Sequence, residues 1–237
     1  MPDHSITLDT SDGPMEVYEA TPDGDARGAV IAIQEAFGVN DHIKDVTRRA
    51  AAAGYHAVAP ALFHRGGGGT AGYEEYEKMF SLFEGVTDEA VLVDVDATLD
   101  HLRGAGFSDE QIGIVGFCFG GRATFLVAAR RSIGAAVGFY GGGIASKGML
   151  PFDPLIDEAA SLKTPWLGLF GDADTGIPIE DVEQLREALK PAAVATDIVR
   201  YEGAEHGFYC DARASYHPEA AKDAWGRALE WFGSHLS

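Results

Sequence analysis

The sequence contains few cysteines and few positive charges. Its two cysteines, Cys118 and Cys210, argue against a disulfide framework and against a structural zinc site built on thiolates. Lysine and arginine number 18 against 37 aspartates and glutamates, so the formal net charge is −19. A surface this acidic repels phosphate groups. We therefore expect neither nucleic acid nor a membrane as a partner.

Long apolar runs and a targeting segment are also missing. No apolar stretch is long enough to span a bilayer. The first residues, Met-Pro-Asp-His-Ser, lack the basic segment and the apolar core of a signal peptide. These absences predict a cytoplasmic protein. The length of 237 residues and the hydrophobic content of 46% fit one globular domain over residues 1–237.

The apolar patterning alternates between strands and helices. A hairpin is predicted first, and the predicted strands are 5–9, 15–20, 29–34, 55–59, 112–115, 135–140, 165–170 and 194–201. Asp41 is the expected cap of the first helix, and the predicted helices are 41–53, 73–83, 87–103, 119–131, 179–189 and 218–232. This order predicts an α/β fold, with a mostly parallel sheet and helices on both faces.

The segment 112–121 carries the most informative motif. It reads Ile-Gly-Ile-Val-Gly-Phe-Cys-Phe-Gly-Gly, so a short apolar strand leads through Cys118 into a helical pattern. The motif matches the nucleophile elbow, with cysteine in place of serine. In such a turn the flanking positions have no room for a Cβ, which accounts for Gly116 and Gly120. A lone cysteine is usually an inert core residue, but glycines at both offsets favour a nucleophile.

A cysteine nucleophile needs a base, an acid that orients the base, and an oxyanion hole. His206 follows the last predicted strand and is the candidate base. Asp172 and Asp174 both follow the strand 165–170, and spacing alone does not separate them, although Asp172 fits a turn residue. The order nucleophile, acid, histidine is the order of the α/β-hydrolases.

The other histidines show no spacing typical of metal ligands, so no metal is expected. We expect them on the surface or in helix caps; they are His4, His42, His56, His64, His101, His217 and His235.

Four motifs together resemble the dienelactone hydrolases (carboxymethylenebutenolidases). They are Gln34-Glu-Ala-Phe-Gly, Gly116-Phe-Cys-Phe-Gly-Gly, Gly171-x-x-Asp-x-x-Ile-Pro and Gly203-Ala-Glu-His-Gly-Phe. They cover nearly the whole chain in order. The resemblance implies an α/β-hydrolase fold, a small ester or lactone substrate, no cofactor, and a triad of Cys118, His206 and Asp174.

The resemblance also implies a role for Glu35 and an oxyanion hole. The Glu35 carboxylate would lie beside the resting thiol and take its proton once substrate displaces the carboxylate. From the residues alone, Glu35 fits a salt bridge or a cap equally well. The backbone N–H groups of Ala36 and Phe119 would hold the oxyanion.

Two departures from the family leave the substrate open. Family members bind a substrate carboxylate with arginines, whereas the region 62–83 carries only Arg65. Cys210 stands four residues after His206, where an arginine is expected, and Arg213 is the nearest replacement. A carboxylesterase with another natural substrate fits the same residues. Outside the hydrolases, the alternative is a non-catalytic binding protein or a thiol redox sensor that pairs Cys118 with Cys210. The sequence does not indicate an oligomeric state.

Overall fold

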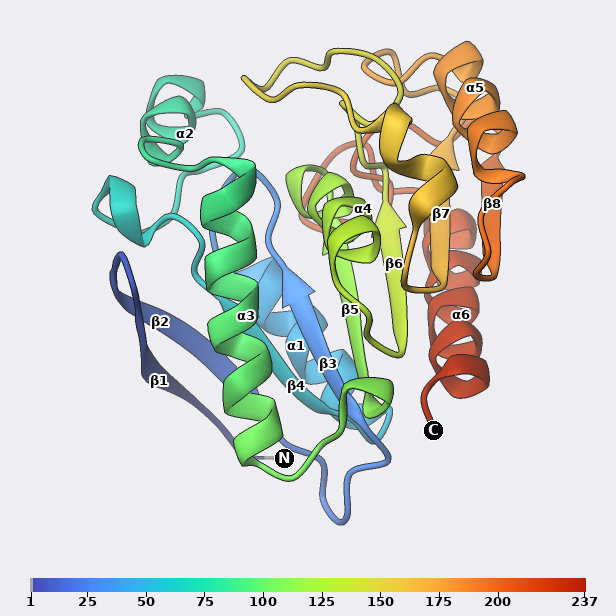
Figure 1. Ribbon diagram of the computed structural model, residues 1–237. Helices are drawn as coiled ribbons and strands as arrows, with labels where there is room; N and C mark the ends of the chain where they lie inside the picture. Colours follow the sequence, from blue (N-terminus) through green and yellow to red (C-terminus); the bar gives the residue numbers. More distant parts are fainter. Residues whose placement is uncertain (1) are drawn as a thin grey trace.

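The computed structural model describes residues 2–237. The chain folds around an eight-stranded sheet (Figure 1). The strand order is β1-β2-β4-β3-β5-β6-β7-β8. In chain order the strands are β1 (Asp3–Thr10), β2 (Gly13–Ala20), β3 (Ala29–Ile33), β4 (His56–Pro60), β5 (Ile112–Phe117), β6 (Ala135–Phe139), β7 (Trp166–Gly171) and β8 (Thr196–Tyr201). Only the β1–β2 and β2–β4 pairs of this sheet are antiparallel. The predicted hairpin and the mostly parallel sheet are confirmed.

Helices cover both faces of the sheet, as predicted. In Figure 1, α3 and α4 lie in front of the sheet and α1 and α6 behind it. The helices are α1 (Asp41–Ala52), α2 (Tyr76–Leu82), α3 (Asp88–Gly104), α4 (Phe119–Arg130), α5 (Ile179–Leu189) and α6 (Pro218–His235). Between residues 2 and 237, no helix combines the length and apolar character needed to cross a membrane.

The ends of the elements differ slightly from the predicted ones. The cap of α1 is Asn40, whose side chain accepts a hydrogen bond from the Ile43 N–H, so the prediction of Asp41 as the cap was wrong by one residue. Three short 3-10 segments were not predicted because they are too short to show a period: η1 (His64–Gly66), η2 (Asp109–Gln111) and η3 (Ile156–Ser161).

The middle of the sheet forms the core. Every residue of β3, β5, β6 and β7 is buried, which explains why these strands read as continuous apolar runs. Each fully buried Val, Ile or Leu side chain contributes about 1.5–3 kcal/mol of transfer free energy.

Parallel strands bring their carboxyl ends to one edge of the sheet. The loops that follow β3, β5, β7 and β8 therefore meet at that edge, although they are far apart in the sequence. These loops carry Glu35, Cys118, Asp174 and His206.

Candidate active site

Cys118 lies at a strained turn between β5 and α4. Its backbone has φ 54° and ψ −112°, and it occupies the N-cap of α4. A positive φ is unfavourable for a residue with a side chain and costs about 1–3 kcal/mol. Close packing holds the turn in place: a Cβ on Gly116 would lie 2.1 Å from the Gly120 carbonyl oxygen, and one on Gly120 would lie 2.4 Å from that of Ile33. The two glycines are therefore required by the fold.

Asp174, and not Asp172, contacts His206. Asp174 is 5% exposed, and its Oδ2 lies 2.6 Å from His206 Nδ1. Its other oxygen accepts a hydrogen bond from the Gly176 N–H at 2.8 Å. The Asp172 carboxylate instead accepts a hydrogen bond from Arg200 Nε at 2.7 Å. The two aspartates left open by the sequence thus have different partners.

The imidazole of His206 is held between two acidic groups. Burial lowers the pKa of His206, but its electrostatic interaction with Cys118 and the hydrogen bonds with Asp174 and Cys118 outweigh it, and the pKa rises to about 10. A cationic imidazole is therefore favoured at this position. The ring of Tyr140 packs against it edge to face, with 5.1 Å between centroids.

Sequence reasoning missed Tyr140 as part of this environment. It directly follows β6, has φ 39°, and is fully buried. Its hydroxyl has no hydrogen-bond partner among residues 2–237. The available signal was that Tyr140 directly follows β6, the neighbour of β5, because parallel strands bring their carboxyl ends to one edge of the sheet.

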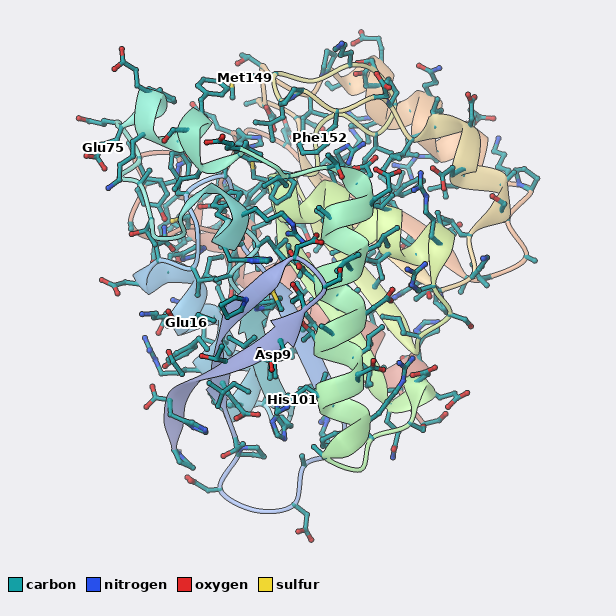
Figure 2. All side chains as sticks on the ribbon, turned by 60° about the vertical axis from the view of Figure 1, so that its left-hand side comes forward. Asp9, Glu16, Glu75, His101, Met149 and Phe152 are labelled. Atoms are coloured by element: carbon teal, nitrogen blue, oxygen red, sulfur yellow. The ribbon has the colours of Figure 1, made fainter. Side chains whose placement is uncertain are left out.

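Cys118, His206 and Asp174 line a cavity of about 400 Å³. Ala36 and Phe119 line it as well, and their backbone N–H groups donate to no backbone carbonyl within the described chain, 2–237. The remaining wall is mostly apolar and includes Phe37, Met79, Met149, Leu150, Phe152 and Ile177. Figure 2 shows Met149 and Phe152 together at the end of the molecule that carries this cavity.

Two arginines reach the cavity, and neither is Arg65. The Arg65 side chain binds Asp94 and Asp12 and does not line the cavity. Arg122 lines the cavity but is 2% exposed and forms a bidentate ion pair with Asp88, with distances of 2.6 and 3.0 Å. Sequence reasoning missed Arg122, although a charged residue inside the apolar helix α4 was a usable signal.

Arg213 is the second arginine of the cavity and pairs with Glu35. Its Nη1 lies 3.6 Å from Glu35 Oε1. Glu35 is fully buried, and neither of its carboxylate oxygens accepts a hydrogen bond from the described residues. This contact matches the salt-bridge interpretation of Glu35. A guarding role towards the Cys118 thiol stays a prediction.

Cys210 lies within 4.8 Å of Glu35 and is a free thiol, as is Cys118. Its Sγ is 3.1 Å from the Tyr73 hydroxyl. Burial raises the pKa of the Cys210 thiol, and the negative charge of Glu35 raises it further. A neutral, buried thiol of this kind is a poor nucleophile.

The expectation of surface or cap positions was wrong for several histidines. His42 and His64 have side chains that are only 2% and 8% exposed, and His64 contacts the buried Asp94 at 3.0 Å. His217 does cap α6, as expected, through the Ala220 N–H. His4, His56 and His101 gather around Glu19. Linear spacing could not show these clusters because their members come from different elements.

Comparison with known proteins relates most of the chain to one group of enzymes. The model of the dienelactone hydrolase family matches residues 15–236. A Methylorubrum extorquens protein provisionally named carboxymethylenebutenolidase is 39% identical over 231 residues, which are 96% of this chain and 79% of that protein. A Bradyrhizobium protein provisionally named 2-oxo-3-(5-oxofuran-2-ylidene)propanoate lactonase is 32% identical over 211 residues, or 88% of this chain and 84% of that one.

A solved structure is equally similar over its full length. The crystal structure of a provisionally assigned dienelactone hydrolase from Klebsiella pneumoniae superposes with a TM-score of 0.87 at 37% identity, covering 99% of both chains. The predicted α/β-hydrolase fold is confirmed by this match.

Proposed function

The chain belongs to the dienelactone hydrolase family, and we propose that it hydrolyses small esters or lactones with Cys118 as nucleophile, His206 as base and Asp174 as orienting acid. Family membership makes it an ester-bond hydrolase. The roles of the three residues are our assignment. The observation that carries it is the 2.6 Å contact of Asp174 with His206, beside a cysteine at a strained elbow.

The reaction proceeds in two halves. The Cys118 sulfur attacks the carbonyl carbon, and the thiol proton resides on His206. The resulting oxyanion accepts hydrogen bonds from the N–H groups of Ala36 and Phe119, and one such donor is typically worth about 3–4 kcal/mol in the transition state. Collapse of this intermediate breaks the carbon–oxygen bond, and the leaving oxygen takes the proton from His206.

The second half releases the acyl group. His206 removes a proton from water, and the water oxygen attacks the thioester carbon. Breaking the carbon–sulfur bond yields the carboxylic acid and returns the proton to the cysteine. Asp174 stabilises the cationic form of His206 in both halves.

The cavity supports a small substrate with one polar end. Its volume of about 400 Å³ lies at the lower end of the usual range for ligand pockets, about 300–1,000 Å³. Apolar side chains line most of it, and Arg213 supplies a positive charge. Because Arg213 is paired with Glu35, an anionic substrate group competes with Glu35 for the guanidinium.

A panel of chromogenic esters and unsaturated lactones tests this proposal. On the best substrate, Cys118→Ala should lose at least about 10³-fold in kcat/KM, since the nucleophile is gone. Circular dichroism should show the native spectrum. Wild-type turnover by folded Cys118→Ala contradicts the assignment. Simultaneous loss of the Cys118 and Cys210 thiols on mild oxidation, without any hydrolysis, would favour a redox sensor instead.

A further inference from the structure

Three histidines surround one buried glutamate on the side of the molecule away from the cavity. Glu19 Oε1 lies 2.5 Å from His56 Nε2 and 3.0 Å from His101 Nε2, and its Oε2 lies 3.3 Å from His4 Nε2. Figure 2 shows His101 on α3 beside the β1–β2 hairpin, at the opposite end from Met149. The cluster is therefore separate from the active site.

The fold fixes where these four side chains start. His4 is the direct cross-strand partner of Glu19 in the β1–β2 pair. Glu19 is opposite Val58 in the β2–β4 pair, and His56 lies two residues before Val58, so it shares the same face of the sheet. Helix α3 packs beside this part of the sheet and supplies His101. Four separate elements thus contribute one group each.

We propose that Glu19, His56 and His101 bind a divalent transition-metal ion of the zinc type, with His4 as a fourth ligand. Imidazole nitrogens and a carboxylate oxygen are the donors that Zn²⁺ takes in proteins, at about 2.0–2.2 Å. The ligand atoms of Glu19, His56 and His101 already lie within 4.8 Å of one another. Neighbouring ligand atoms of a tetrahedral ion stand about 3.2–3.6 Å apart. Small shifts of these three side chains therefore suffice to admit the ion, whereas His4 lies outside this group and has to turn towards it.

The groups around Glu19 are arranged as the ligands of a cation would be. His56 and His101 both direct Nε2 at the same carboxylate oxygen, at 2.5 and 3.0 Å, so three potential ligand atoms already converge on one point. All ion-pair partners of Glu19 in the described residues are histidines, with no lysine or arginine among them. A metal ion binds both imidazoles and the carboxylate together.

A second group of donor residues in the chain is less suited to a cation. Glu35, His42 and Cys210 also bring their ligand atoms within 4.8 Å of one another. However, the guanidinium of Arg213 lies 3.6 Å from Glu35 and already neutralises that carboxylate. This second cluster provides a control within the same protein.

The expected effect of metal at Glu19 is structural. The ion links the β1–β2 hairpin and β4 to α3. The Glu19 side chain is 8% exposed, whereas the His4 side chain is 57% exposed and leaves a path from solvent to the site. No atom of this cluster lines the active-site cavity. Binding should therefore raise thermal stability without changing ester hydrolysis at saturating substrate.

Titration of chelator-treated protein with Zn²⁺ and Co²⁺ tests the site. Calorimetry should give one Zn²⁺ per chain, and Co²⁺ should develop the visible bands of a low-coordinate nitrogen and oxygen site. At a hundredfold excess over Kd, Zn²⁺ should raise Tm by about 5–10 °C.

Variants separate the two clusters. The double variant His56→Ala/His101→Ala should weaken Zn²⁺ binding at least about 100-fold, and the exposed single variant His4→Ala should weaken it while keeping the fold. Cys210→Ala should keep full binding at the Glu19 cluster. Failure of the wild-type protein to bind, or loss of binding in Cys210→Ala with retention in the His56/His101 variant, would overturn the proposal.

Discussion

Replacing Asp174 with asparagine tests the core of the proposed mechanism. The side chain keeps its shape but loses the charge that lies 2.6 Å from His206 Nδ1. Asp174 is 5% exposed, so water does not screen this interaction strongly. Asparagine also has an amide that can donate to the ring, which favours the tautomer in which His206 cannot accept a proton from the thiol.

The expected loss follows from these two effects. A charge-assisted hydrogen bond contributes about 1.5–3 kcal/mol, and the wrong tautomer adds to it. We expect a total of about 3–5 kcal/mol in transition-state stabilisation, or a fall in kcat/KM of about 10²–10⁴-fold. Because Asp174 also raises the pKa of His206, the pH dependence of kcat/KM should move to lower pH in the variant.

Asp172→Asn is the matched control, two residues away. Its carboxylate pairs with Arg200, and both side chains are partly exposed, at 23% and 29%. Such a pair contributes about 0–1 kcal/mol to stability. Because Asp172 bonds to Arg200 and Asp174 is the aspartate that contacts His206, kcat/KM should stay within about threefold. Ester hydrolysis measured for both folded variants decides the matter. A larger loss in Asp172→Asn, or full activity in Asp174→Asn, refutes the reasoning.

Three further predictions concern pH, the buried carboxylate and the elbow glycine. Folding raises the pKa of His206 from 6.5 to about 10. The protonated side chain therefore stabilises the folded protein fully below pH 6.5, and this contribution is lost as the pH rises towards 10. The urea midpoint of the wild-type protein should fall over this range, and that of His206→Gln should fall less. Glu35→Gln should raise the alkylation rate of Cys118 near neutral pH by up to about tenfold, and an unchanged rate–pH profile in folded protein excludes the guarded thiol. Gly116→Ala should lower the free energy of unfolding in urea by about 3 kcal/mol, because the new Cβ meets backbone atoms. Gly226→Ala, which has open space in α6, should raise it by up to about 1 kcal/mol. Equal effects of the two substitutions contradict this account.

The sequence predicts the fold well because its signals are local. Continuous apolar runs mark the buried strands, and helical spacing marks the helices between them. The elbow is equally local, since Gly116, Cys118 and Gly120 lie within one turn. Family resemblance selected Asp174 over Asp172, a choice that spacing alone left open.

The remaining features depend on which distant side chains face one another. The pairing of Glu35 with Arg213 joins residues from the loop after β3 and from the loop before α6. Glu19 meets its three histidines only because β1, β2, β4 and α3 pack together. Linear spacing contains no record of such contacts, so reasoning from the sequence treated these histidines as scattered.

The position of β8 at the outer edge of the sheet has a consequence for heat inactivation. Among residues 2–237 this strand pairs with β7 alone, and the loop after it carries His206. Edge strands open by local fluctuation at a lower free energy than the central strands. The amide protons of β8 should therefore exchange with deuterium sooner than those of β5, and reversible loss of hydrolysis should begin at temperatures where the centre of the sheet is still intact.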